Sequence, residues 1–155
     1  MSLANTLTSQ EHELLLREAT PGQRQEIAAL LSTNKLPVND LTEAVTLYAL
    51  MYNGNLAGSA GLEIYGTQAL LRSVSVADSG KGRGWGKFIS HEIEKLAQQQ
   101  GIEELYLVTT TAEGFFQKLG YRKVERSNVA EAVLVSGQFN GICPASAAIM
   151  VKQIQ

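Results

Sequence analysis

The sequence has little cysteine, little net charge and no long apolar run. A single cysteine, Cys143, occurs in 155 residues, so no disulfide can form within the chain and a cytoplasmic location is expected. The formal net charge is only −2, which predicts no nucleic-acid partner, because nucleic-acid-binding domains usually present a basic face. No apolar run approaches the roughly 18 residues of a membrane helix. His12 and His91 lie far apart, outside any cluster with metal-ligand spacing, so no metal is expected.

The length and composition are those of one folded domain. A chain of 155 residues, of which 45% are hydrophobic, is long enough to bury a core of its own. Residues 1–12 are polar and lack the apolar region of a signal peptide. We therefore expect a flexible leader over residues 1–12 and a single domain over residues 13–155.

A glycine-rich loop, Gly80-Lys81-Gly82-Arg83-Gly84-Trp85-Gly86, lies between an apolar strand and a long amphipathic helix. Alternating glycines permit positive φ angles and let a ligand approach without a Cβ in the way. Successive N–H groups at the start of a helix bind anions, and Lys81 and Arg83 add charge that suits phosphate. The loop is therefore interpreted as a pyrophosphate site, whereas a plain flexible turn would not need four glycines and two cations.

Two common phosphate motifs do not match this loop. A Walker loop requires a Lys-Ser or Lys-Thr pair after its last glycine, and the loop has none. A Rossmann fingerprint requires G-x-G-x-x-G/A, and here the third glycine, Gly86, falls one residue early. The pattern that fits is [Q/R]-x-x-G-x-[G/A], with Lys81 at the first position.

Hydrophobic periodicity and turn residues predict an α+β chain with seven strands. Asn53-Gly54 is the strongest hairpin signal, and the apolar stripe from Trp85 to Ala97 marks the helix after the loop as a core helix. Helices are expected from Pro21 to Lys35, after Gly84, over Ala112–Leu119 and, weakly, over Val129–Phe139. Strands are expected over Leu14–Ala19, Ala44–Tyr52, Leu56–Tyr65, Ala69–Ala77, Ile102–Val108, Tyr121–Arg126 and Ala147–Ile154. A strand, a crossover helix and a buried strand imply a parallel pair on either side of that core helix.

The loop and this element order resemble the GCN5-related N-acetyltransferases (GNAT). A second motif agrees with the resemblance, because Thr109-x-x-Ala112-x-x-Phe115-Phe116-x-x-x-Gly120-Tyr121 is similar to the family pattern N-x-x-A-x-x-F-Y-x-x-x-G-F. The segments LLRSVSV, LYLVTTTAEGFFQKLGYRKV and CPASA also resemble arsenic-resistance-type (ArsN-type) members. The resemblance implies a mixed sheet splayed at an acyl-CoA site, and the activity of an acetyl-CoA-dependent N-acetyltransferase of a small-molecule amine.

The resemblance also implies where acetyl-CoA would bind. The pantetheine arm would lie along Val74, Ser75 and Val76, between the two parallel strands. The pyrophosphate would contact the amides of Lys81, Gly82, Arg83, Gly84, Trp85 and Gly86, with Thr109, Phe115 and Phe116 as further contacts. The amine would then attack the thioester directly, and N–H groups near Val74 or Ser75 would stabilise the developing oxyanion.

The chain departs from the family at the residue that the family uses to protonate the leaving thiolate. Phe116 stands where a tyrosine is usual, and phenylalanine has no proton to give. A thiolate leaves tolerably without an acid, because thiol pKa values lie near 8.5. Hydroxyls of Ser75 or of residues 109–111 could substitute through a water molecule, which makes Ser75 and Thr109 candidate catalytic residues.

Arg72 and Glu63 are charges within apolar strands. On a regular strand Arg72 shares a face with Leu70, Val74 and Val76. A structural Arg–Glu pair across the hairpin is one interpretation. The other is that Arg72 binds an anionic acceptor and Glu63 deprotonates the ammonium of that acceptor. Residues 127–146, between the last two expected strands, are expected to form a wall of the acceptor pocket. Cys143 in this segment is assigned either to that pocket or to an inert, buried thiol.

The sequence leaves three alternatives open, of which two concern an active enzyme and one concerns a monomer. Phe116 and Thr109 favour a catalytically weak acyl-CoA binder or sensor of the same fold. A non-enzymatic interaction module is disfavoured, because an unused phosphate site has no reason to keep Lys81 and Arg83. A homodimer is the remaining alternative, since dimers are common in the family and the last strand is expected to offer a pairing edge.

Overall fold

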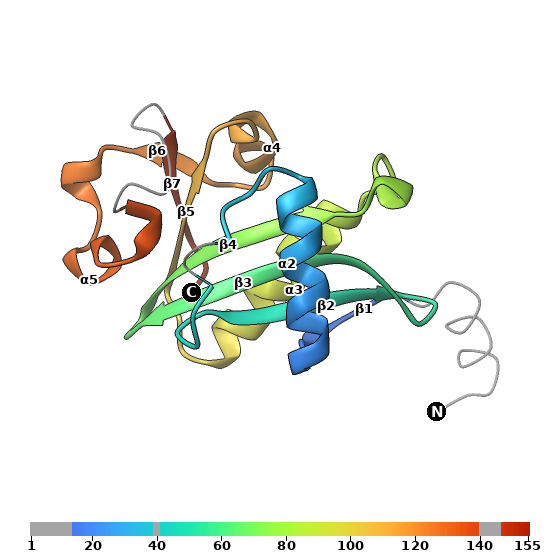
Figure 1. The fold of residues 1–155 in the computed structure, drawn as a ribbon. Coiled ribbons are helices and arrows are strands. Elements are labelled where there is room, and N and C mark those ends of the chain that lie inside the picture. Colours follow the sequence, from blue (N-terminus) through green and yellow to red (C-terminus); the bar gives the residue numbers. More distant parts are fainter. Residues whose placement is uncertain (1–13, 39–40, 140–146) are drawn as a thin grey trace, which may run out of the picture.

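A computed structural model describes residues 14–38, 41–139 and 147–155, which form a seven-stranded mixed sheet with helices on both faces (Figure 1). Its strands are β1 (Leu14–Glu18), β2 (Thr46–Tyr52), β3 (Asn55–Tyr65), β4 (Gln68–Val76), β5 (Glu104–Thr109), β6 (Arg122–Val124) and β7 (Ala148–Gln153). They are ordered β1-β2-β3-β4-β5-β7-β6, and only the β4–β5 pair is parallel. The α+β fold, the strand number and the parallel pair are as predicted.

The last strand is not an edge of this sheet. β7 pairs with β5 on one side and with β6 on the other, so the prediction that it offers a pairing edge for a dimer is wrong. The prediction failed because the last strand in the chain is not the last in the sheet. The short β6 pairs with β7 on the side away from β5. In the described residues the edges of the sheet are β1 and β6.

The helices cover the two faces of the sheet in pairs. α3 (Trp85–Gln99) and α4 (Glu113–Lys118) pack on one face, in the largest apolar cluster. α2 (Pro21–Thr33) and α5 (Glu131–Leu134) cover the opposite face, in two smaller clusters (Figure 1).

Local chemistry explains where the long helices begin. Thr20 forms a capping box with Gln23, and Pro21 occupies the first turn of α2, an arrangement that satisfies otherwise unpaired N–H groups. In α3 the predicted apolar stripe is confirmed, because Trp85, Ile89, Ile93 and Ala97 are buried. The Val129–Phe139 prediction is only partly correct, since that segment contains the short α5 and a 3-10 turn.

The hairpin between β2 and β3 has the turn that its sequence predicts. Asn53 and Gly54 have φ angles of 51° and 86°, and positive φ at both central residues is typical of the tight turn preferred by Asn-Gly. β2, β3 and β4 form the expected antiparallel meander. This meander carries β4 to the glycine-rich loop.

A β-bulge at Ser73 interrupts β4. Ser59 pairs with Ser75 and Gly61 pairs with Arg72, so β4 has one more residue than β3 at this point. Ser73 has a φ of 57°, and the Ser59 hydroxyl donates to the Ser73 carbonyl at 2.8 Å. An extra residue reverses the alternation of side chains beyond it.

The bulge corrects the predicted environment of Arg72. Arg72 shares a face with Leu70, as expected, but Val74 and Val76 point to the other face and pack in the α3 cluster. Ser75 takes their place on the face of Arg72. The expectation failed because it assumed a regular strand.

β4 and β5 separate soon after they pair. Their parallel ladder joins residues 68–70 to residues 104–106 and then stops. The remainder of β4, from Leu71 to Val76, has no ladder partner on its β5 side in the described residues. The splayed sheet that the resemblance implied is therefore present.

Candidate functional site

A cleft of about 710 Å³ lies over the separated ends of β4 and β5. Its walls come from the end of α2, the second half of β4, the end of β5 and the start of α4. The described residues that line it are Thr33, Asn34, Lys35, Leu36, Pro37, Leu71, Arg72, Ser73, Val74, Ser75, Val76, Lys81, Leu107, Val108, Thr109, Thr110, Thr111, Ala112, Phe115, Phe116 and Gln138. A cleft of this volume is large enough to hold much of a small-molecule ligand.

Many of the predicted site residues line this cleft. They are Arg72, Val74, Ser75, Val76, Lys81, Thr109, Phe115 and Phe116. Other predicted residues are outside its lining, namely Glu63, Gly82, Arg83, Gly84, Trp85 and Gly86, of which the last five form the adjacent loop and the start of α3. Cys143 falls outside the described residues.

The glycine-rich loop has the backbone geometry of an anion site. Gly82 and Gly84 have φ angles of 82° and 78°, and a Cβ on either would meet nothing within 4 Å. Gly84 is the N-cap of α3, so the loop leads directly into the first N–H groups of a 15-residue helix. Such N–H groups, with the positive end of the helix dipole, favour negatively charged ligands.

The two cations of the loop have different surroundings. The Lys81 ammonium lies 3.0 Å from the Asp78 carboxylate, is well exposed and lines the cleft. The Arg83 guanidinium instead lies over the rings of Tyr52 and Trp85, at 4.7 Å and 4.6 Å from their centroids, and donates to the Tyr52 hydroxyl at 3.1 Å. Arg83 therefore has a structural role in holding the loop, whereas Lys81 faces the cleft.

The second motif forms the opposite wall. The Thr109 hydroxyl accepts a hydrogen bond from the Ala112 N–H at 3.0 Å, so it caps the turn that leads into α4. Phe116 is buried and makes edge contacts with Phe115 and Tyr121. Phe115 is 39% exposed. A Cβ on Gly86 would lie 3.2 Å from the Phe115 ring, so α4 and α3 touch at the mouth of the cleft.

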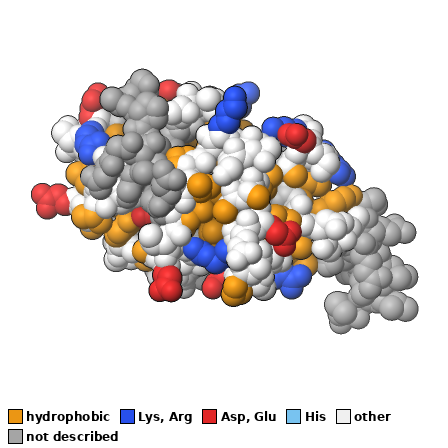
Figure 2. Space-filling view, viewed as in Figure 1, with side chains coloured by type: hydrophobic (Ala, Val, Ile, Leu, Met, Phe, Trp, Pro, Cys, Tyr) orange, Lys and Arg blue, Asp and Glu red, His pale blue; other side chains and the backbone are white. Residues whose placement is uncertain are grey.

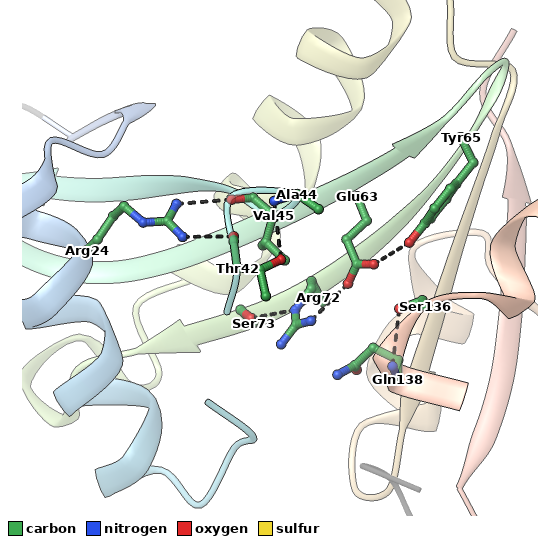
Figure 3. Close-up of polar contacts among 10 residues, drawn as sticks. All are labelled: Arg24, Thr42, Ala44, Val45, Glu63, Tyr65, Arg72, Ser73, Ser136 and Gln138. Carbon is green, nitrogen blue, oxygen red and sulfur yellow. Dashed lines mark hydrogen bonds and ion pairs between the residues drawn. The ribbon is translucent and has the colours of Figure 1, made fainter. Parts of the chain in front are cut away.

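Arg72 of β4 and Glu63 of β3 form a buried ion pair (Figure 3). The Arg72 Nη1 lies 2.8 Å from Glu63 Oε2, and the Arg72 side chain is only 1% exposed. The Tyr65 hydroxyl donates to the other oxygen of Glu63. Burial and this hydrogen bond raise the pKa of Tyr65 to about 12. The pair across the hairpin is therefore present, and Arg72 also lines the cleft.

Sequence reasoning missed one wall of the cleft. Asn34, Lys35, Leu36 and Pro37 follow α2, and Gln138 follows α5. In the sequence, Lys35-Leu36-Pro37 indicates only the end of a helix. Its place beside β4 depends on how α2 crosses the sheet, which no local pattern encodes. Gln138 lies in the 127–146 segment that was expected to form a wall of the acceptor pocket.

The charges along the lining are of one sign. Arg72, Lys35 and Lys81 are the charged residues among the described lining residues, and none of those residues is a carboxylate. Two of these cations are paired with carboxylates outside the lining, Arg72 with Glu63 and Lys81 with Asp78. On the face of the molecule drawn in Figure 2, blue and red side chains are interspersed.

The described residues contain neither a cluster of metal ligands nor a membrane-spanning helix. Within residues 14–38, 41–139 and 147–155, no three His, Cys, Asp or Glu side chains come together as metal ligands would. None of the helices in those ranges has the length and apolar character needed to cross a membrane.

The family comparison agrees with this architecture. A model of the Acetyltransferase (GNAT) family matches residues 10–121, which include β1 to β5, the glycine-rich loop and α4. The chain therefore belongs to the Acetyltransferase (GNAT) family.

Two curated relatives match parts of the chain. An uncharacterized N-acetyltransferase of Chlorobaculum tepidum is 26% identical over 76 residues, which are 48% of each protein. A Bacillus subtilis protein named as an acetyltransferase is 31% identical over 88 residues, 56% of this chain and 60% of the relative. The match thus spans about half the length of these relatives.

Solved structures share the fold. N-acetylglutamate synthase from Neisseria gonorrhoeae, complexed with coenzyme A and N-acetyl-glutamate, has a TM-score of 0.76 at 22% identity, over 92% of this chain and 35% of that one. A GNAT-family acetyltransferase from Staphylococcus aureus has a TM-score of 0.71 at 14% identity, over 92% and 99% of the two chains. At these identities the likeness shows the GNAT fold.

Proposed function

We propose that this chain is an acetyl-CoA-dependent N-acetyltransferase acting on a small-molecule amine. The observation that supports it is the cleft over the separated strands, with the glycine-rich loop beside it. The free edge of β4 offers backbone groups to an extended pantetheine arm, and the amides of residues 81–86 suit a pyrophosphate. The domain is proposed to extend over residues 13–155.

Acetyl-CoA supplies an acetyl group activated as a thioester. The amine nitrogen forms the new C–N bond while the C–S bond breaks, and the proton lost by nitrogen ends on sulfur. The chain contributes position above all, since the cleft holds both reactants side by side. N–H groups of β4 near Val74 or Ser75 stabilise charge on the carbonyl oxygen.

The lining supports an acceptor that carries an anionic group as well as its amine. Arg72 and Lys35 line the cleft, and the described lining holds no carboxylate that would attract a polyamine. The gonococcal synthase was solved with N-acetyl-glutamate, so this fold accommodates a carboxylate-bearing product. Arg72 would bind the anionic group, while Glu63 holds the guanidinium and, through water, serves as the base.

A catalytically weak acyl-CoA binder is the second candidate, and Phe116 favours it because this position lacks a hydroxyl. A narrower relation to ArsN-type members would make an amine-bearing arsenical the acceptor. Cys143 would have a reactive role in acceptor binding only if the acceptor is such an arsenical. An assay of CoA release with different amines separates these alternatives.

Two measurements test the proposed function. Calorimetry with acetyl-CoA should show binding, and absence of binding would exclude both an enzyme and a sensor. Release of free CoA should then be measured with L-glutamate, L-methionine, spermidine, kanamycin and an amine-bearing arsenical. We expect the fastest release with a carboxylate-bearing amine. Binding without release from any of them would favour the sensor.

Arg72→Ala and Arg72→Lys examine the acceptor role. Arg72→Ala should raise the KM for a carboxylate-bearing amine about tenfold or more, and Arg72→Lys should raise it less, because a point charge replaces a bidentate fork. An unchanged acceptor KM in a folded Arg72→Ala variant would exclude acceptor binding by Arg72. The Kd for acetyl-CoA serves as the control in both variants.

A further inference from the structure

Asn34 connects the end of α2 to β4 inside the cleft. Its Nδ2 donates to the Ser75 Oγ and, at 3.3 Å, to the Val76 carbonyl. Asn34 is half-buried and follows the last turn of α2, while Ser75 comes two residues after the bulge in β4. Both residues line the cleft.

The Val76 carbonyl determines which way the Asn34 amide faces. A carbonyl oxygen can only accept, so the Asn34 atom beside it must be the NH₂ group and not the amide oxygen. The same NH₂ group is the one in contact with Ser75. The Ser75 oxygen must therefore accept from Asn34, and its own proton must point elsewhere.

That proton has no acceptor among the described residues. Ser75 is 5% exposed and lines the cleft, so its hydroxyl has access to a ligand there but little to bulk water. A buried O–H without an acceptor costs free energy that a ligand can recover. Thr33, another hydroxyl of the lining, donates instead to the Ala29 carbonyl at 3.0 Å, so its proton is already used.

We propose that Ser75 donates a hydrogen bond to the sulfur of coenzyme A, and that Asn34 is the positioning residue that directs this proton into the cleft. The inference rests on the proposed function. Backbone N–H groups of β4 already serve the carbonyl oxygen, whereas Phe116 leaves the sulfur without a side-chain donor. Ser75 keeps its proton throughout, since it stabilises the thiolate that the amine proton then neutralises.

The pKa of the thiol of bound CoA tests this without an acceptor. Thiolate absorbance is followed against pH in the complex of the full chain with CoA. A hydrogen-bond donor to sulfur should hold the pKa of the bound CoA thiol below its value in free CoA. Simple thiols have pKa values near 8.5. Ser75→Ala should raise it by about 1 to 2, as expected for loss of a hydrogen bond to a charged group.

The variants of Asn34 distinguish positioning from general packing. Asn34→Leu should also raise the thiol pKa, because nothing then fixes the direction of the Ser75 proton. The double variant Asn34→Leu/Ser75→Ala should match Ser75→Ala alone, since Asn34 acts only through Ser75. Ser75→Thr keeps the hydroxyl and should retain the low thiol pKa. Thr33→Val is the matched control and should leave it unchanged.

Calorimetry of CoA binding separates failure of this inference from failure of the proposed function. If CoA binds and Ser75→Ala leaves the thiol pKa unchanged, the inference is overturned while the coenzyme site stands. If Thr109→Val raises the thiol pKa and Ser75→Ala does not, Thr109 is the donor and the inference is again overturned. If CoA does not bind at all, both proposals fail.

Discussion

The ring of Trp85 packs directly on the backbone of Gly80. A Cβ on Gly80 would lie only 2.0 Å from Cε3 of that ring. The Arg83 guanidinium lies over the rings of Trp85 and Tyr52. The first glycine of the loop is thus required by packing, whereas Gly82 and Gly84 are required by their positive φ angles.

Gly80→Ala should therefore displace Trp85 and disturb the loop. We expect destabilisation of about 1 to 3 kcal/mol, the usual cost of overpacking, and at least tenfold weaker binding of acetyl-CoA, both measurable by thermal unfolding and calorimetry. Gly114→Ala in α4 is the matched control, because a Cβ there meets nothing within 4 Å. Equal effects of the two substitutions would contradict the packing role of Gly80.

The loop and α3 were predictable because their causes are local. Positive φ at Gly82 and Gly84 and the apolar stripe from Trp85 to Ala97 follow from residues close in the sequence. The parallel pairing of β4 and β5 was also predictable, since a crossover helix of this length requires it.

The bulge at Ser73 was not predictable, because it depends on contacts across strands. Ser73 is not a residue that favours a φ of 57°, and the Ser59 hydroxyl that holds its carbonyl is 14 residues away. The bulge decides that Ser75, and not Val74, shares the face of Arg72. The contact between Asn34 and Ser75 spans 41 residues and depends on that same shift.

The Arg72–Glu63 pair is expected to contribute strongly to the unfolding free energy. Removing one partner leaves a buried charge, so Glu63→Gln and Arg72→Met should each destabilise by roughly 3 to 5 kcal/mol. The double variant Glu63→Gln/Arg72→Met should be more stable than the sum of the two changes predicts. Urea unfolding of the four proteins gives the coupling free energy.

An exposed ion pair provides the comparison for this double-mutant cycle of Arg72 and Glu63. Lys95 and Glu92 in α3 are 2.9 Å apart but solvent-accessible, and such pairs contribute only about 0 to 1 kcal/mol. A coupling free energy for Arg72 and Glu63 no larger than that of Lys95 and Glu92 would contradict the structural role of the buried pair.

Tyr65 should make stability depend on alkaline pH. Its pKa is raised to about 12 in the folded state, whereas an unfolded tyrosine titrates near 10. Between these values the unfolded chain has lost a proton that the folded chain keeps, so the unfolding free energy falls as pH rises from about 10 to 12. Tyr65→Phe should show a shallower decline in Tm over this window, with phenolate absorbance reporting the titration directly.

The other tyrosines require a control for this measurement. Burial also raises the pKa of Tyr48, Tyr106 and Tyr121, so the wild-type decline is shared among several groups. Only the difference between wild type and Tyr65→Phe is assigned to Tyr65. Identical slopes for the two proteins between pH 10 and 12 would show that Tyr65 titrates normally.

Lys81 and Arg83 should differ in how they affect acetyl-CoA binding. Lys81 lines the cleft and is exposed, so Lys81→Ala should weaken binding about two- to tenfold at low ionic strength and less as salt increases. Arg83→Ala removes cation–π contacts with Tyr52 and Trp85. It should lower Tm and weaken binding to an extent that varies less with salt, because the lost contacts hold the loop and do not meet the ligand.

Calorimetry at several salt concentrations distinguishes the two cations. Lys95→Ala, at the far end of α3, removes an exposed charge outside the cleft lining and serves as the control. If Arg83→Ala gave the larger, salt-dependent loss with an unchanged Tm, the guanidinium would have to leave the two rings and meet the phosphates itself. The loop would then act by rearrangement, and the packing of Arg83 on Trp85 would describe only its ligand-free state.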